Sequence, residues 1–145
     1  MTEELRWDDV PQVTRAGQED TQTLQSGDCI RVSGVGPQHT PATKLWFGKV
    51  TNKPGYRSLP HHHGEAETGG YVLKGKGRIY YGPDYAQYVD MEEGDWVWVP
   101  PFMPHVECNM STTDDLIWLT TRTPENLVFN LDDVEDSDLD GYRRS

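Results

Sequence analysis

Glycine and proline recur at such short intervals along this chain that only short segments of regular structure fit between them. The 145 residues include 14 Gly and 10 Pro. The runs between them are rich in Val, Ile, Tyr and Trp, which favour extended backbone. None of these runs has a convincing amphipathic helical pattern, so the sequence predicts an all-β fold in a single domain.

Turn-forming residues separate the strand-like runs along most of the chain. Gly75-Lys76 joins two runs in a hairpin-like manner, and residues 92–95 form another turn. Regular turns at this spacing are typical of a sandwich or a barrel rather than of βαβ units. The segments expected to be extended are 30–35, 44–51, 57–63, 70–74, 77–81, 85–91, 96–99, 105–109, 115–121 and 127–131.

The two ends of the chain differ from its middle. Residues 1–24 are polar without a sustained period, and they predict an N-terminal arm in which Trp7 and Val10 pack on the domain or on a neighbouring subunit. Residues 25–130 are expected to form the β domain. Residues 131–145 are strongly acidic and predict a solvated, disordered tail, which serves solubility or recruits a basic partner.

Charge and composition exclude several classes of protein. The net charge of −11 argues against nucleic-acid binding, which needs a basic surface. No window approaches the roughly 18 apolar residues of a membrane span, and no basic segment followed by an apolar one suggests a secretory signal. Two cysteines are too few for a disulfide framework. We therefore expect reduced thiols in a cytoplasmic protein.

Three histidines and one glutamate form a candidate metal site. On an extended strand, side chains two positions apart point to the same face, about 7 Å apart. His61 and His63 can therefore bind one ion, whereas His62 points to the opposite face. Glu67 lies beyond a glycine, where a turn can bring its carboxylate round, and His105 must come from a neighbouring strand. Imidazole and carboxylate are good ligands for first-row transition metals.

Two motifs contain these residues at fixed spacings. The first motif comprises Gly55, His61, His63, Glu67 and Gly75. The second comprises Gly94, Pro100, His105 and Asn109, with Phe102 where the pattern has a glycine. Over about residues 40–125 the chain resembles a small single-domain cupin, a family of double-stranded β-helix barrels. The resemblance implies a metal inside the barrel, bound by His61, His63, Glu67 and His105, and a homodimer. It does not imply one activity.

The carboxylate position of the first motif can be assigned in two ways. Taking Glu67 leaves seven residues before Gly75, whereas the motif has six. Counting back from Gly75 places Thr68 there instead. We favour Glu67, because a carboxylate is a far better metal ligand than a hydroxyl, with a β-bulge at Gly69-Gly70 absorbing the extra residue. The alternative is a three-histidine site.

Such a ligand set leaves one or two coordination positions open, as catalytic sites do. It suits one divalent transition metal per chain, with Fe(II) favoured and Mn, Ni, Cu, Co or Zn as alternatives. The opposite interpretation is a metal-free barrel with a polar lumen, in which those groups would be costly to bury.

Two further residues are candidates for contact with a substrate. Arg57 shares strand parity with His61 and can clamp a substrate carboxylate, or it is a surface arginine near the mouth. Glu107 shares parity with His105 and can serve as a general base, or it is an exposed or ion-paired glutamate. Trp96 and Trp98 share one strand face, which suggests a contact between sheets or between subunits.

These expectations combine into a metal-dependent enzyme acting on a small organic molecule, with a non-haem Fe(II) dioxygenase as the favoured class. A non-redox isomerase, lyase or cyclase would use the same ligands. A metal- or ligand-binding module without turnover is the alternative outside enzymes.

Overall fold

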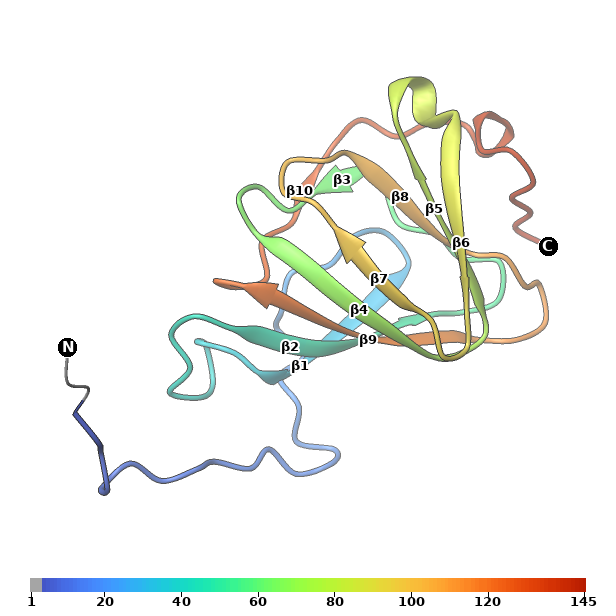
Figure 1. Cartoon of the computed structure of the whole chain (residues 1–145). Helices are drawn as coiled ribbons and strands as arrows, with labels where there is room; N and C mark the ends of the chain where they lie inside the picture. Colours follow the sequence, from blue (N-terminus) through green and yellow to red (C-terminus); the bar gives the residue numbers. More distant parts are fainter. Residues whose placement is uncertain (1–3) are drawn as a thin grey trace.

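The computed structural model describes residues 4–145 and contains ten strands in two antiparallel five-stranded sheets. The first sheet has the order β1 (Cys29–Val35), β2 (Trp46–Asn52), β9 (Leu116–Thr123), β4 (Glu67–Lys74) and β7 (Trp96–Val99). The second has the order β10 (Phe129–Asn130), β3 (His61–His62), β8 (His105–Asn109), β5 (Lys76–Tyr81) and β6 (Gln87–Glu92). Figure 1 shows the two sheets facing each other around a common interior. The predicted all-β fold is confirmed.

Every run expected to be extended contains a strand, but residues 57–63 and 127–131 each contain a strand of only two residues. Of residues 57–63, only β3 is a strand, and Arg57 makes an isolated bridge to Cys108. Pro60 lacks the N–H that a continuous ladder would need. Two 3₁₀ turns, η1 (Pro83–Tyr85) and η2 (Asp136–Asp138), complete the regular structure of residues 4–145. No helix in this part of the chain is long and apolar enough to cross a membrane.

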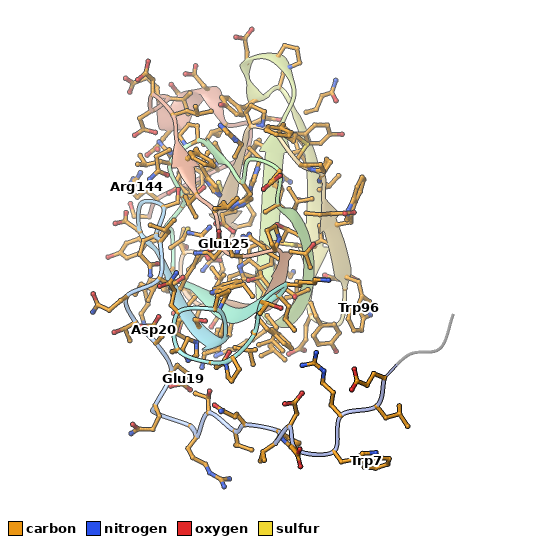
Figure 2. All side chains as sticks on the ribbon, turned by 90° about the vertical axis from the view of Figure 1, so that its left-hand side faces the viewer. Trp7, Glu19, Asp20, Trp96, Glu125 and Arg144 are labelled. Carbon is orange, nitrogen blue, oxygen red and sulfur yellow. The ribbon has the colours of Figure 1, made fainter. Side chains whose placement is uncertain are left out.

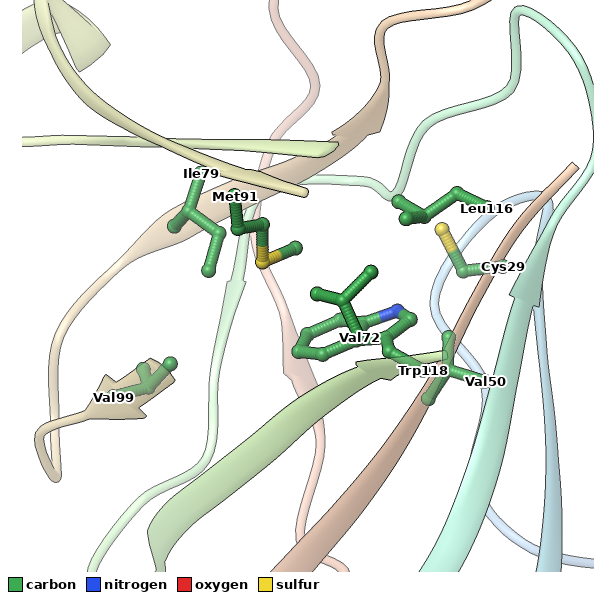
Figure 3. Packing of buried hydrophobic residues seen from close by; sticks show 8 residues of the cluster. All are labelled: Cys29, Val50, Val72, Ile79, Met91, Val99, Leu116 and Trp118. Atoms are coloured by element: carbon green, nitrogen blue, oxygen red, sulfur yellow. The ribbon is translucent and has the colours of Figure 1, made fainter. Parts of the chain in front are cut away.

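The interior of the barrel changes character along its length. Inward-facing residues of β9 run from Leu116 and Trp118 to Thr120 and Arg122, and all four are buried. The apolar end, which Figure 3 shows in close-up, draws side chains from both sheets. Its buried members are Cys29, Val50, Val72, Ile79, Met91, Val99, Leu116 and Trp118. The other end of the lumen is polar, and it contains the histidines.

The C-terminal segment is packed, which corrects the expectation of a disordered tail at residues 131–145. Leu139 and Tyr142 are buried on the outer face of the second sheet, against Val106 and Cys108. The Tyr142 hydroxyl donates to the carbonyl of Gly55. The prediction failed because it rested on the acidic composition of the segment, whereas the packing depends on these two apolar residues. The segment covers the outer face of β8, and every residue of that strand is therefore buried.

The N-terminal arm runs outside the barrel, as the view in Figure 2 shows. Trp7 is 86% exposed, and Val10 is exposed too. Neither side chain therefore packs on the domain, which was one of the two predicted alternatives. Among residues 4–24, the arm pairs with the first sheet at Asp20, which forms a bridge to Ser33. The part of the predicted arm at residues 1–3 lies outside the described residues.

Candidate metal centre

Three of the four predicted ligands converge inside the barrel. His61 on β3 stands directly opposite His105 on β8, and His63 follows two residues after His61. The candidate ligand atoms of these three residues all lie within 4.8 Å of one another. All three side chains are buried. The antiparallel pairing of two short strands therefore brings together histidines that are far apart in the sequence.

Each ring is held by a backbone carbonyl through its Nδ1 atom. The Nδ1 atoms lie 2.7 Å from the oxygen of Leu59 for His61, 2.6 Å from that of Leu127 for His63 and 2.9 Å from that of Met103 for His105. A carbonyl oxygen can only accept, so each Nδ1 carries the hydrogen and donates it. Each Nε2 atom then presents a lone pair. Metal-bound histidines are fixed in this way, with the other ring nitrogen donating to an oxygen.

Burial keeps the three imidazoles neutral. Desolvation is the largest cause that lowers the pKa of His61, His63 and His105, and the cations around them lower it further. Arg31 contributes to all three pKa shifts, and Arg122 to those of His63 and His105. Neutral imidazole is the form that binds a metal. In tautomer, charge and spacing, the three histidines fit a divalent transition metal.

Glu67 does not join the three histidines, which corrects the four-ligand expectation. Its side chain is exposed on the outer face, where it accepts a hydrogen bond of 2.6 Å from the indole of Trp98. The register of β4 is continuous from Glu67 to Val72, and its irregularity lies between Val72 and Lys74 rather than at Gly69-Gly70. Strand alternation therefore turns Thr68 into the lumen and Glu67 away from it. The structure has the three-histidine arrangement.

The neighbouring histidine is placed as predicted. His62 lies outside the cluster, with its ring stacked on Phe129 at 5.1 Å between centroids. Phe102, which stands at the glycine position of the second motif, is exposed and has a φ of 57°. Only glycine adopts this left-handed backbone without cost. The loop between β7 and β8 therefore keeps the backbone shape of the motif without its glycine.

Three charged side chains surround the histidines. Nη2 of Arg31 donates to Oε1 of Glu107 at 2.5 Å and lies 3.5 Å from Nε2 of His61. Nη2 of Arg122 lies 3.2 Å from Nε2 of His63. Both arginines and Glu107 are almost completely buried. The polar end of the lumen is therefore both charged and dry.

Arg122 has further contacts on the side away from His63. Its Nη1 atom donates to the side-chain oxygen of Asn126 at 3.0 Å, and its guanidinium lies 5.2 Å from the ring of Trp46. Gly48 leaves space for that ring, since a Cβ there would come within 2.4 Å of it. In the described residues, no carboxylate pairs with Arg122.

Sequence reasoning missed both arginines. The signal was available in strand parity. Arg31 alternates with the inward residues Cys29 and Ser33, and Arg122 lies on the inward side of β9 with Trp118. A charged residue at an inward position is a stronger indication of function than an exposed one.

The two substrate-contact candidates have different positions. Oε1 of Glu107 lies 3.8 Å from Nε2 of His61, so this residue belongs to the site as strand parity predicted. Arg57 does not. It faces outward and binds the C-terminal segment through Asp133, Asp136 and the carbonyl of Val134. The proline before His61 breaks the strand, and the parity argument therefore fails at Arg57.

Comparison with known families agrees with this geometry. The sequence profile of the cupin domain matches residues 48–122, which is just over half of the chain. The chain belongs to the cupin family. This cupin has no significant match among curated proteins.

Solved structures with the same fold are numerous but distant in sequence. A double-stranded β-helix protein from Klebsiella pneumoniae has 16% identity and a TM-score of 0.61, over 77% of this chain and 91% of that one. The polyketide cyclase RemF from Streptomyces resistomycificus has 18% identity and a TM-score of 0.64, over 98% of this chain and 96% of that one. An oxalate oxidase has 17% identity and a TM-score of 0.62, over 77% of this chain and 58% of that one. These similarities show the fold.

Proposed function

We propose that this cupin is a metal-dependent enzyme acting on a small organic molecule, with a non-haem Fe(II) dioxygenase as the favoured class. The observation that carries the proposal is the convergence of three neutral imidazoles, each with Nδ1–H bound to a carbonyl, so that each Nε2 atom carries the lone pair. One divalent transition metal per chain would be held by His61, His63 and His105. When bound, such a metal supplies Lewis acidity and, as Fe(II), redox chemistry with O₂.

The protein supplies orientation, a dry environment and a proton acceptor. The carbonyls of Leu59, Met103 and Leu127 fix the ring planes, so the ligands need little reorganisation. Burial of the histidines excludes bulk water. Oε2 of Glu107 is buried without a hydrogen-bond partner, and it is the acceptor available for a substrate proton.

A non-redox reaction is the second candidate, and one observation favours it. The polyketide cyclase RemF aligns over almost the entire length of both chains. The choice of metal has a similar alternative, because an oxalate decarboxylase of Bacillus subtilis with this fold has Mn(II) centres. Histidine ligands accept Fe(II), Mn(II), Ni(II), Cu(II), Co(II) and Zn(II), so the donor atoms alone do not choose among them.

Elemental analysis of protein purified without an affinity tag tests the metal centre. We expect stoichiometric metal in the parent protein and loss of most of it in His61→Ala and His105→Ala, because each removes one ligand. His62→Ala is the matched control and should keep its metal. Glu67→Ala should keep it too, since Glu67 lies outside the cluster. Full metal in both ligand variants would refute the assignment.

Oxygen uptake separates the two reaction classes. Anaerobically prepared protein is loaded with Fe(II) or with Zn(II) and assayed with phenolic, thiol and keto-acid substrates. The dioxygenase proposal predicts uptake with Fe(II) alone. Turnover with Zn(II), together with no oxygen uptake on any substrate, would support the non-redox class instead.

We also propose that the protein is a homodimer and cytoplasmic. Trp96 is 80% exposed on the outer face of the first sheet, and Trp98 and Phe47 are exposed too, which suits a second copy of the chain. Light scattering should give a dimer for the parent and a monomer for Trp96→Glu/Trp98→Glu. Cys29 and Cys108 are free, buried thiols, as expected in a reducing compartment.

A further inference from the structure

The polar end of the lumen has an excess of positive charge. Two guanidinium groups, Arg31 and Arg122, flank the histidines, whereas Glu107 is the one carboxylate in contact with them among the described residues. A divalent metal on the histidines would add two more positive charges. Buried charges need partners, so this end of the lumen requires an anion that the chain itself does not provide.

Several hydrogen-bond donors at this end have no partner. They are buried, and they belong to both arginines and to two threonines on neighbouring strands of the first sheet. The atoms are Nε and Nη1 of Arg31, Nε of Arg122, Oγ1 of Thr68 and Oγ1 of Thr120. Most buried polar groups in proteins are paired, so a cluster of free donors indicates a missing acceptor.

The strand register brings the free donors together. Thr68 on β4 stands opposite Arg122 on β9, and both side chains point into the lumen. Cross-strand neighbours on one face have their Cβ atoms about 5 Å apart. Thr120 lies on the same face of β9, two residues before Arg122. Nη2 of Arg122 is within 3.2 Å of His63, so these groups adjoin the metal centre.

Thr68 also stands where the first motif has its glutamate. The site therefore has a neutral hydroxyl in place of a carboxylate, while Arg31 and Arg122 lie against His61 and His63 of the same cluster. The guanidinium of Arg122 is buried and has no carboxylate partner among the described residues. The negative charge that the motif would place here has to come from the ligand.

We propose that Arg31, Arg122, Thr68 and Thr120 form an anion site that binds the carboxylate of a small organic acid beside the three histidines. Guanidinium and hydroxyl groups are donors, and a carboxylate accepts from several of them at once. The assignment of this acid as the substrate rests on the proposed metal enzyme. The anion site itself does not depend on a metal.

Binding of matched acids and amides tests the anion site in metal-free protein. Formate, acetate and malonate are compared with formamide, acetamide and malonamide, which have similar shapes but no charge. Dissociation constants come from the dose dependence of thermal stabilisation at constant ionic strength. We expect at least one acid to bind at least about 30-fold more tightly than its amide, which equals about 2 kcal/mol. No binding of any acid, or equal binding of acid and amide, would overturn the proposal.

Variants assign the binding to these residues. Arg122→Gln leaves no carboxylate unpaired, and it should weaken acid binding about 30-fold, as expected for the loss of a charge-assisted hydrogen bond. Thr68→Val keeps the shape and removes one donor, so a smaller loss of about fivefold is expected. Arg78→Gln is the control, because Arg78 pairs with Asp90 outside the lumen. Equal acid affinity in Arg122→Gln and Arg78→Gln would overturn the proposal.

Arg31 is tested with a double variant, because removing Arg31 alone leaves Glu107 buried without its cation. Arg31→Gln/Glu107→Gln removes both charges, and it should also bind the acids more weakly than Arg78→Gln does. The metal content of Arg122→Gln, loaded with Zn(II), should equal that of the parent. A protein that takes up no metal but binds acids through Arg122 would refute the proposed enzyme and keep the anion site. A protein that takes up metal without binding acids would refute the anion site and keep the proposed metal enzyme.

Discussion

The two ends of the barrel interior are built on the same strands but serve different purposes. At the apolar end, Val50, Val72 and Leu116 fill the space between the sheets with side chains that need no hydrogen-bond partner. At the polar end, the inward positions of the same strands hold Arg122, Thr68 and Thr120, several of whose polar atoms have no partner. The apolar end stabilises the fold. Buried polar atoms without partners at the polar end cost stability, as expected where a proposed binding site competes with packing.

The largest loss of stability should come from disrupting the packing at the apolar end. Trp118→Ala removes a completely buried ring and should lower the free energy of unfolding by about 3–5 kcal/mol. Urea unfolding followed by circular dichroism measures it. Trp7→Ala is the control, since Trp7 is exposed in the arm, and it should change stability by less than about 0.5 kcal/mol. Similar losses in both variants would mean that the apolar end is not the stabilising core.

The buried ion pair of the polar end should behave differently. Arg31→Leu leaves Glu107 buried without its cation and should cost about 3 kcal/mol. Arg31→Leu/Glu107→Leu removes both charges and should recover most of that loss, because no unpaired charge then remains buried. A double variant as unstable as the sum of the two single variants would show that Arg31 and Glu107 do not interact, which would contradict the buried ion pair.

A single hydroxyl gives the finest test of the polar end. Thr120→Val replaces a buried, unpartnered hydroxyl with a methyl group and should raise the free energy of unfolding by about 1 kcal/mol in acid-free buffer. The adjacent Thr121 is the matched control. Its hydroxyl donates to the carbonyl of Trp46 at 2.9 Å, so Thr121→Val should lower stability by about 1 kcal/mol. If both variants changed stability in the same direction, unpaired and paired hydroxyls would not differ here.

The smallest effect concerns charges outside the lumen, in the C-terminal segment. Arg144 and then Arg57 lower the pKa of Asp136 from 3.8 to about 2. Because the folded pKa is depressed, this carboxylate contributes its stability above pH 4 and loses it as the pH falls to about 2. The contribution is below about 1 kcal/mol, because Asp136 is partly exposed and solvent screens the pairs.

Unfolding of the parent and of Asp136→Asn at several pH values measures this contribution. The difference in free energy of unfolding should be largest above pH 4 and should shrink as the pH falls through about 2. Asp114→Asn serves as the control because Asp114 forms no ion pair among the described residues. A difference for Asp136→Asn that does not change with pH would contradict the depressed pKa.

Local patterns predicted most of the strands and the three histidines. Alternation is a property of the backbone itself, so the positions of His61, His62 and His63 followed from it directly. The pattern could not locate the register irregularity of β4, which lies between Val72 and Lys74. One residue of shift exchanges the two faces of a strand, and the choice of Glu67 over Thr68 depended on it.

The C-terminal segment shows a different limit. Its composition is typical of a disordered tail, but Leu139 and Tyr142 find a partner surface on the second sheet. Composition reports the average tendency of a segment, whereas burial depends on a few side chains and on what lies opposite them. Arg57 was misplaced for a related reason, since its partners Asp133 and Asp136 belong to that segment.

The sequence by itself determined the all-β class, the cupin motifs and the histidine triad, because these depend on short-range periodicity and fixed spacings. Tertiary structure alone decided that Arg31 would reach Glu107 on β8, a residue 76 positions away, and that Arg122 would adjoin His63. Which buried charge meets which partner depends on strand order and register across two sheets. Those long-range pairings place two buried arginines beside the three histidines, and the proposed acid site depends on them.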